Sequence, residues 1–321
     1  MKKSLQLRGA LALALCLAGA AAPTAAWSAA PLVKTQAPGY YRMMLGEFEV
    51  TALSDGTVAL PMDKLLNQPA AKTSKALARA YLQAPVETSI NGFLINTGSK
   101  LVLIDTGAAG LFGPTVGKLL GNLKAAGYTP DQVDEIYITH MHPDHVGGLM
   151  ADGKPAFPNA VVRADQRDAD FWLSQKNMEA APKEAQGFFQ GAMASLNPYV
   201  TSAKFKPFSG NTDLVPGIKA VASYGHTAGH TTYVVESGGQ KLVLWGDLMH
   251  VAAVQFPEPG VTIQFDTDSK SAAVQRKKAY AEAAKQGYWV AAAHLAFPGI
   301  GHLRSEGHGY AFVPANYSVP R

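Results

Sequence analysis

One short stretch constrains this chain more than any other: residues 140–145 read His-Met-His-Pro-Asp-His. It follows an apolar, β-branched run over 133–138 that predicts a buried strand, and a proline and a glycine pair mark a turn. Because alternate side chains of a strand point the same way, His140 and His142 lean to one side of it. Asp144 and His145 follow the turn and can face a second ion. The spacing predicts a metal site, although histidines can also cluster in an ordinary polar loop.

Residues 1–30 have the pattern of a secretory signal rather than of a folded segment. Basic residues up to Arg8 precede an apolar stretch over 10–22, and small residues at 28–30 suit a signal peptidase. The stretch is too short to span a bilayer comfortably, so we expect an exported protein, periplasmic or secreted, with no membrane partner. The remaining chain, 31–321, is expected to form a single domain, although its length would also allow two.

Charge and cysteine content exclude several partners and ligands. Loss of the leader removes three positive charges and no acid, which lowers the net charge from +4 to +1. A nucleic-acid partner would require a basic stripe, and the sequence has none, so we expect no nucleic acid. Cys16 is the only cysteine, so the mature chain has no thiolate. Any metal must therefore bind to nitrogen and oxygen atoms.

Apolar runs and turn residues predict alternating strands and helices, which is typical of a layered α/β sandwich. The expected strands cover 46–53, 93–96, 101–104, 133–138, 160–163, 218–224, 232–236, 241–245 and 288–293. The first should end in a turn at 54–57. The expected helices lie within 62–86 and at 115–126, 165–175, 183–196 and 272–286.

Several polar residues stand where predicted strands end. They are Asp105, His140, His226, Asp247 and His294. If the strands belong to one sheet system, their ends meet at one rim, where loops build sites. All nine histidines also lie beyond residue 139. We therefore expect these side chains to converge.

Through its His-x-His-x-Asp-His stretch, the chain resembles the metallo-β-lactamase-fold hydrolases. The resemblance implies an αββα sandwich, in which two packed mixed sheets are flanked by helices. It also implies two divalent ions joined by a bridging carboxylate. The implied ligands are His140, His142 and His226 for one ion, Asp144, His145 and His294 for the other, and Asp247 as the bridge.

Four other polar residues have supporting or alternative roles. Asp105 resembles the family's aspartate that supports the metal loop without binding metal; a turn cap is the alternative reading. His230 is expected to form hydrogen bonds or to pack. His302 is the rival of His294 as the last ligand, but we expect it in a loop, and we expect His308 to face solvent.

A site of nitrogen and oxygen ligands suits zinc, with manganese, cobalt or iron as alternatives. Two ions that share a carboxylate also share a water, whose pKa they lower from ~15.7 toward ~7, so that it attacks as hydroxide. Asp144 is expected to pass a proton to the leaving oxygen. Asp144 and the bridging Asp247 are thus the predicted catalytic carboxylates.

A closer similarity, to methyl parathion hydrolase and its lactonase relatives, covers essentially the whole mature chain. It is carried by the segments 40–43, 53–61, 105–113 and 294–302. The similarity implies a homodimer and a pocket with aromatic walls. Those walls would contain Phe112, Trp172 and Phe188, for which core packing is the alternative.

Two positions depart from the organophosphate-cleaving members. His250 stands where they have an apolar residue, and Leu65 where they have a basic one. An imidazole in the pocket wall favours hydrolysis of lactones and aryl esters, with phosphotriester cleavage secondary, unless His250 faces away. The alternatives are a dedicated organophosphate hydrolase and a non-catalytic metal-binding protein. A serine hydrolase is disfavoured because no Gly-x-Ser-x-Gly segment occurs.

Overall fold

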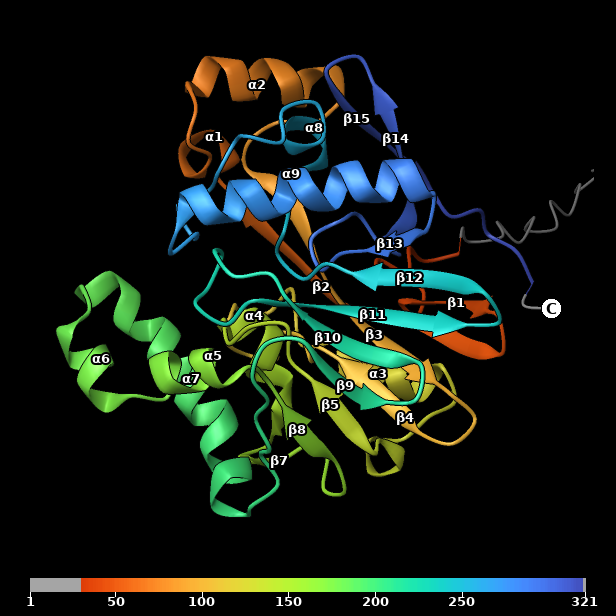
Figure 1. Cartoon of the computed structure of the whole chain (residues 1–321), viewed down its shortest axis with the longest axis vertical. Helices are drawn as coiled ribbons and strands as arrows, with labels where there is room; N and C mark the ends of the chain where they lie inside the picture. The colour runs from red at the N-terminus through yellow and green to blue at the C-terminus, as the bar shows by residue number, and fades with distance from the viewer. Residues whose placement is uncertain (1–29, 320–321) are drawn as a thin grey trace, which may run out of the picture. The chain divides into compact units, whose positions relative to one another are not determined.

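Two β-sheets packed face to face lie at the centre of the fold (Figure 1). The computed structural model describes residues 30–319, and its helices and strands all lie in the unit that begins at Ala37. Residues 30–36 contain no helix or strand. The predicted leader therefore falls outside the described residues, apart from Ala30. No helix in the described part of the chain is long and apolar enough to cross a membrane.

The first sheet has six strands in the order β1-β2-β3-β4-β5-β8. Their bounds are β1 Tyr40–Leu45, β2 Phe48–Leu60, β3 Val86–Asn96, β4 Leu101–Ile104, β5 Glu135–Tyr137 and β8 Val161–Arg163. The pairs β4–β5 and β5–β8 are parallel, and the others are antiparallel. A two-stranded ribbon, β6 Met150–Ala151 with β7 Lys154–Pro155, stands apart from this sheet.

The second sheet has seven strands in the order β15-β14-β13-β12-β11-β10-β9. Their bounds are β9 Thr212–Val215, β10 Ile218–Ala222, β11 Thr231–Ser237, β12 Gln240–Leu244, β13 Trp289–Ala291, β14 Ile300–Glu306 and β15 Gly309–Pro314. Only the pairing of β12 with β13 is parallel among these strands.

Alternating side chains divide each strand between two layers of core. In β4, Val102 and Ile104 point into the core between the sheets, whereas Leu101 and Leu103 pack in the cluster on the outer face. That outer cluster includes residues of α3 Leu119–Ala125, α5 Gln166–Trp172 and α7 Lys183–Thr201. Helix α9, Ser269–Gln286, lies on the outer face of the second sheet (Figure 1). The order helix, sheet, sheet, helix confirms the predicted αββα sandwich.

Short helices complete the fold. They are α1 Met62–Leu65, α2 Ala70–Arg79, α4 Pro143–Val146, α6 Gln175–Ala180 and α8 Ala252–Gln255, with 3₁₀ turns at Pro130–Gln132 and Gly147–Leu149.

Two element boundaries differ from the prediction because of glycines. Strand β2 does not end at 53 but continues to Leu60, with a register shift between Ser54 and Gly56. Gly56 has φ +129°, and a Cβ there would lie 2.1 Å from the carbonyl oxygen of Thr115. Helix α3 begins only at Leu119, because Gly117, with φ +83°, interrupts the helical backbone before it.

The hairpin of β14 and β15 was not predicted. His302, expected in a loop, lies in β14, where its ring packs 3.8 Å from that of Trp289 and its Nδ1 is 3.2 Å from the carbonyl oxygen of Tyr288. The surrounding glycines suggest a loop, but pairing with strands on both sides extends the backbone. His308 is exposed, as predicted.

Strand direction brings the predicted site residues to one rim. Asp105 follows β4 and His140 follows β5, and these strands are parallel neighbours. Asp247 and His294 follow β12 and β13, which are also parallel. His226 follows β10, which runs in the direction of β12 because both are antiparallel to β11. Parallel strands present their carboxyl ends at the same edge, so the loops of both sheets meet there.

Asp55, on β2, fastens the loop that follows β4. Its carboxylate is 1% exposed and accepts hydrogen bonds from the backbone nitrogens of Ala108 (2.9 Å), Gly117 (3.0 Å) and Leu119 (3.0 Å). Three backbone donors far along the chain are thus satisfied by one side chain.

We expect Asp55→Asn to lower the free energy of unfolding by about 2–4 kcal/mol, because an amide replaces one acceptor oxygen with a donor and leaves buried N–H groups unpaired. Urea unfolding of the metal-free protein measures this. The matched control is Asp213→Asn, an exposed aspartate of β9, which should change stability by less than about 0.5 kcal/mol. Equal effects of the two substitutions would contradict the assignment.

Candidate metal centre

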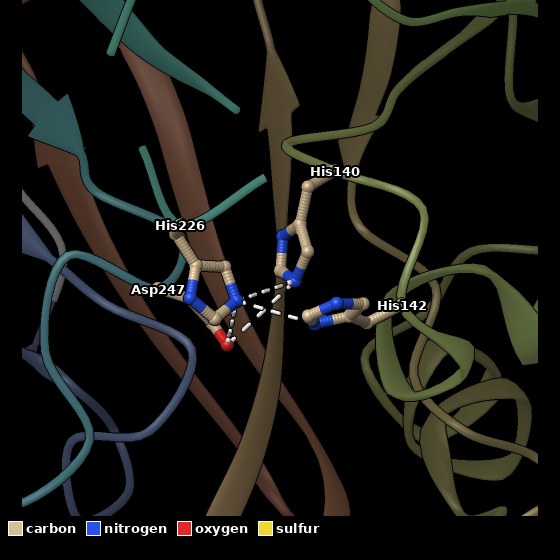
Figure 2. Close-up of side chains that lie close together, drawn as sticks. All are labelled: His140, His142, His226 and Asp247. Carbon is tan, nitrogen blue, oxygen red and sulfur yellow. Dashed lines mark hydrogen bonds and ion pairs between the residues drawn. The ribbon is translucent and has the colours of Figure 1, made fainter. Parts of the chain in front are cut away.

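Four buried side chains from three separate loops form the first ligand group (Figure 2). His226 Nε2 lies 3.2 Å from His140 Nε2 and 3.2 Å from His142 Nδ1. The same nitrogen is 3.4 Å from Asp247 Oδ2, and His140 Nε2 is 3.7 Å from that oxygen. The atoms face a common centre, as the sequence analysis predicted for the first ion.

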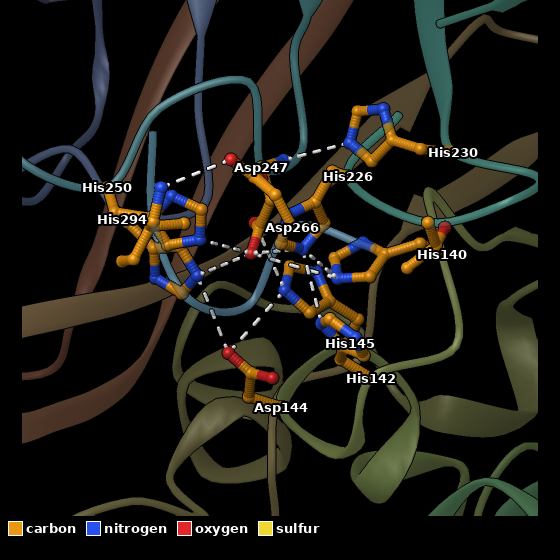
Figure 3. Close-up of polar contacts among 12 residues, drawn as sticks. His140, His142, Asp144, His145, His226, His230, Asp247, His250, Asp266 and His294 are labelled. Atoms are coloured by element: carbon orange, nitrogen blue, oxygen red, sulfur yellow. Dashed lines mark hydrogen bonds and ion pairs between the residues drawn. The ribbon is translucent and has the colours of Figure 1, made fainter. Parts of the chain in front are cut away.

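A second group adjoins the first through Asp247 (Figure 3). Asp144 Oδ2 lies 3.5 Å from both His145 Nε2 and His294 Nε2. Asp247 reaches this group as well, with Oδ1 3.2 Å from His145 Nε2 and Oδ2 3.1 Å from His294 Nε2. The structure therefore brings together all seven predicted ligands, with Asp247 between the two groups.

The spacing of these atoms suits divalent cations. Zinc binds imidazole nitrogen at about 2.0–2.1 Å, so neighbouring ligands in a tetrahedral site lie about 3.4 Å apart. The separations in both groups, 3.1–3.7 Å, bracket that value. Among the described residues, His145 Nε2 and Asp247 Oδ1 have no hydrogen-bond partner although both are buried. Buried polar atoms without partners are costly, and a bound cation would satisfy them.

Burial and neighbouring charges divide the imidazoles into two protonation states. Burial, with the nearby His145, lowers the pKa of His140 well below its usual value. Burial acts in the same direction on His226, but the carboxylates of Asp247 and Asp266 outweigh it and raise the pKa of that ring to about 9. Protons thus partly balance the buried carboxylates when no cation is bound, and metal binding would release them.

Asp105 holds the metal loop from behind. Its Oδ2 lies 2.8 Å from His145 Nδ1 and accepts a hydrogen bond of 2.8 Å from Thr139 Oγ1, while Oδ1 accepts one from the Thr139 backbone nitrogen (2.8 Å). A proton on His145 Nδ1 leaves Nε2 free to bind an ion. Asp105 also has φ +58°, so the turn position and the support of the loop coincide.

Other ligands are fixed through their second ring nitrogen or their backbone. His294 Nδ1 lies 2.9 Å from the carbonyl oxygen of Ser89, and His226 Nδ1 lies 2.9 Å from Asp266 Oδ1. His230 makes hydrogen bonds rather than facing the ligand groups: its Nε2 accepts from the Asp247 backbone nitrogen at 3.0 Å. Burial, with the nearby His226, lowers the pKa of His230 to about 3, which keeps that nitrogen free to accept.

Two buried aspartates of this site were missed by the sequence analysis. Asp168 accepts hydrogen bonds from the backbone nitrogens of Met141 (3.0 Å) and Gly229 (2.6 Å), which ties the loop of His140 to the loop of His226. Asp266 lies in a polar segment that follows no predicted strand. Asp168 falls within a predicted helix. Neither had a local signal, because the partners are distant in the sequence.

A cavity of about 130 Å³ opens beside Asp144, Asp247 and His294. Three predicted pocket residues line it: Phe112, Phe188 and His250. The predicted ligand His142 also lines it. The wall residues without a predicted role are Val58, Leu60, Thr88, Ile90 and Phe265. His250 faces Asp247, with Nε2 3.0 Å from Oδ2. Burial lowers the pKa of His250 to about 4, so the ring is neutral at pH 7.

Trp172 and Leu65 do not line this cavity, contrary to the prediction. Trp172 is 5% exposed and packs edge-on behind His142, with ring centroids 5.1 Å apart, within the outer core cluster. Leu65 packs against the cluster around Met62 and Ile263. Both side chains have apolar neighbours nearby in the fold, which draw them into the core.

We expect Asp105→Asn to weaken binding of one divalent ion by roughly 10–100-fold, because the amide is a poorer acceptor for the proton on His145 Nδ1. Competition with a chelating indicator measures the affinity. Asp152→Asn is the matched control, since Asp152 also has a positive φ (+50°) but is exposed. Unchanged affinity in the Asp105 variant would show that Asp105 is only a turn cap.

Comparison with known proteins places this geometry in a family. Residues 86–285 match the Metallo-beta-lactamase superfamily. The fold is similar to that of the hydrolase AbOPH of the beta lactamase superfamily, with TM-score 0.84 and 40% identity over 89% of this chain and 100% of that one. It is also similar to AidC, a dizinc quorum-quenching lactonase solved with the product N-hexanoyl-L-homoserine, with TM-score 0.79 and 28% identity over 88% and 99%.

Among curated proteins, an N-acyl homoserine lactonase of Bacillus sp. is 25% identical over 164 residues, 45% of this chain. The match spans 57% of that lactonase. The prediction of a metal-dependent hydrolase agrees with these relatives. The matched region, the αββα sandwich and the paired ligand groups together show that the chain belongs to the metallo-β-lactamase superfamily.

Proposed function

We propose that this protein is a metal-dependent hydrolase of lactones and aryl esters, with two bound zinc ions and with secondary activity on phosphotriesters. One observation carries the proposal: two ligand groups share Asp247 at the floor of a small cavity with mostly apolar walls. The similarity to AidC, a dizinc lactonase, supports both the metal pair and the substrate class.

Bound ions would supply an acidified water and polarise the carbonyl oxygen of the substrate. Side chains of the protein would bind the substrate, exclude water and transfer the proton. Apolar side chains such as Phe188 and Phe265 exclude water and hold an acyl or aryl group. Asp144 lies on the cavity wall with its side chain 15% exposed. Burial raises the pKa of its carboxyl, but the nearby His145 and His294 outweigh burial and hold that pKa below its usual value. In the proposal Asp144 therefore only relays the proton of the attacking water to the leaving oxygen.

His250 favours lactones over phosphotriesters in this proposal. Its neutral ring lines the cavity. Nε2 lies 3.0 Å from Asp247 Oδ2, and Nδ1 has no hydrogen-bond partner among the described residues. A planar ester can place one of its oxygens within hydrogen-bond distance of a ring N–H of His250. A tetrahedral phosphorus centre with two alkoxy groups is bulkier and fits less well into this cavity of about 130 Å³. We propose phosphotriester cleavage as the secondary activity because segments of the sequence resemble methyl parathion hydrolase.

Chelation should abolish hydrolysis of an aryl lactone, and added zinc, manganese or cobalt should restore it, because the reaction depends on the ions held by these ligands. Initial rates before chelation, after it and after reconstitution measure this. Reconstituted protein that binds two ions but hydrolyses no lactone, aryl ester or phosphotriester would favour the alternative of a non-catalytic metal-binding protein.

We expect His250→Leu to lower the ratio of aryl lactone to phosphotriester turnover by about tenfold, the effect of one lost hydrogen bond in the transition state. Both rates are measured on protein with verified metal content, since His250 also approaches Asp247. Phe265→Leu, in the same wall, is the control and should leave the ratio within about threefold. An unchanged ratio in His250→Leu would refute this role and reopen the alternative of a dedicated organophosphate hydrolase.

Export and homodimeric assembly also belong to the proposal. The leader pattern of residues 1–30 supports export. The dimer is proposed because segments of the sequence resemble methyl parathion hydrolase. Cell fractionation with N-terminal sequencing tests export, and light scattering of the purified protein tests the dimer.

A further inference from the structure

A buried arginine, Arg276, lies on α9 outside both ligand groups. Its side chain is 0% exposed. Nε donates to the carbonyl oxygen of Leu248, and Nη1 donates to the carbonyl oxygens of Val261 (2.7 Å) and Pro259 (3.3 Å). Leu248 directly follows Asp247 in the sequence. The guanidinium therefore anchors the segment that carries the bridging carboxylate.

The same guanidinium faces Asp266. Arg276 Nη2 lies 3.8 Å from Asp266 Oδ2, which is an ion-pair contact rather than a hydrogen bond. Asp266 Oδ2 accepts a hydrogen bond from the Ile263 backbone nitrogen at 3.1 Å. The other oxygen of Asp266 lies 2.9 Å from His226 Nδ1. The Asp266 side chain is 0% exposed. The buried guanidinium of Arg276 thus lies close to Asp266, which contacts His226, and to the backbone segment that follows Asp247.

The cost of burying a guanidinium indicates more than a packing role. Moving such a charge out of water costs several kcal/mol, which opposite charge and hydrogen bonds must offset. A neutral donor could satisfy the carbonyl oxygens alone. The carboxylate of Asp266, equally buried, is the group that needs a cation. The backbone beside Asp266 adds to the connection, because the Thr267 nitrogen donates to the His226 carbonyl oxygen at 2.9 Å.

We propose that Arg276 is a positioning residue of the metal centre: it fixes Asp266 so that Asp266 holds His226 with Nε2 toward the first ion. The inference rests on the proposed two-metal function. It predicts that substitutions of Arg276 and Asp266 lower the metal affinity in a non-additive way. Neither residue lines the cavity.

The test compares five variants with the full-length wild type: Arg276→Met, Arg276→Lys, Asp266→Asn, the double variant of Arg276→Met with Asp266→Asn, and Tyr280→Phe. Tyr280 is the matched control, because it is buried one turn further along α9 and its hydroxyl has no partner in the described part of the chain. Competition of zinc with a chelating indicator gives the dissociation constant of each ion. Urea unfolding of the metal-free proteins gives their stability separately.

We expect each single substitution to weaken one of the two ions by roughly 10–100-fold and to leave the other within about threefold. The double variant should bind that ion no more than about threefold more weakly than the weaker single variant, because coupled residues are not additive. Tyr280→Phe should keep both affinities. Arg276→Lys, which retains the charge without the planar fork, should bind with intermediate affinity.

The possible outcomes distinguish failure of the proposed metal centre from failure of the proposed role of Arg276. Wild-type protein that binds fewer than two ions overturns the proposed metal centre itself. Wild-type binding of two ions, with unchanged affinity in Arg276→Met but lower stability, makes Arg276 merely structural and overturns the inference alone. Additive losses in the double variant overturn it too. If Arg276→Met does not fold, Arg276→Lys decides: wild-type affinity for both ions refutes the role.

Discussion

A single buried carboxylate organises this molecule. Asp247 is 3% exposed, and its oxygens lie 3.0–3.7 Å from nitrogens of five different imidazoles. An anion in such surroundings is stable only when cations or protons balance it and its position is fixed. The position is fixed from behind, where His230 accepts from its backbone nitrogen. The neighbouring loops are arranged around this charge.

Three buried aspartates outside the ligand groups hold the ligands and their loops in place. Asp105 supports His145, Asp266 supports His226, and Asp168 joins the loops of His140 and His226. Each would be costly alone, but each accepts several donors that would otherwise be unsatisfied. Hydrogen bonds of this kind hold loops in one arrangement before any ion arrives. The site can therefore be precise although most of its residues lie outside regular strands.

The cavity wall combines segments that lie far apart in the sequence. Val58 and Leu60 come from β2, Phe188 comes from α7, and Phe112 and Phe265 come from two separate loops. Such a wall can change without disturbing the ligands, which stand on the strand ends.

The sequence by itself determined the local part of the site. Strand period and a proline turn set the directions of His140 to His145, and the ends of apolar runs marked His226, Asp247 and His294, because parallel strands share an edge. Only the tertiary structure decided that Trp172 lies in the core and Leu65 packs against it, and that His302 lies in a strand. It alone also placed Asp266 against His226, with Arg276 beside Asp266. These placements depend on contacts between segments far apart in the chain, and such contacts leave no periodic signal in the residues on either side.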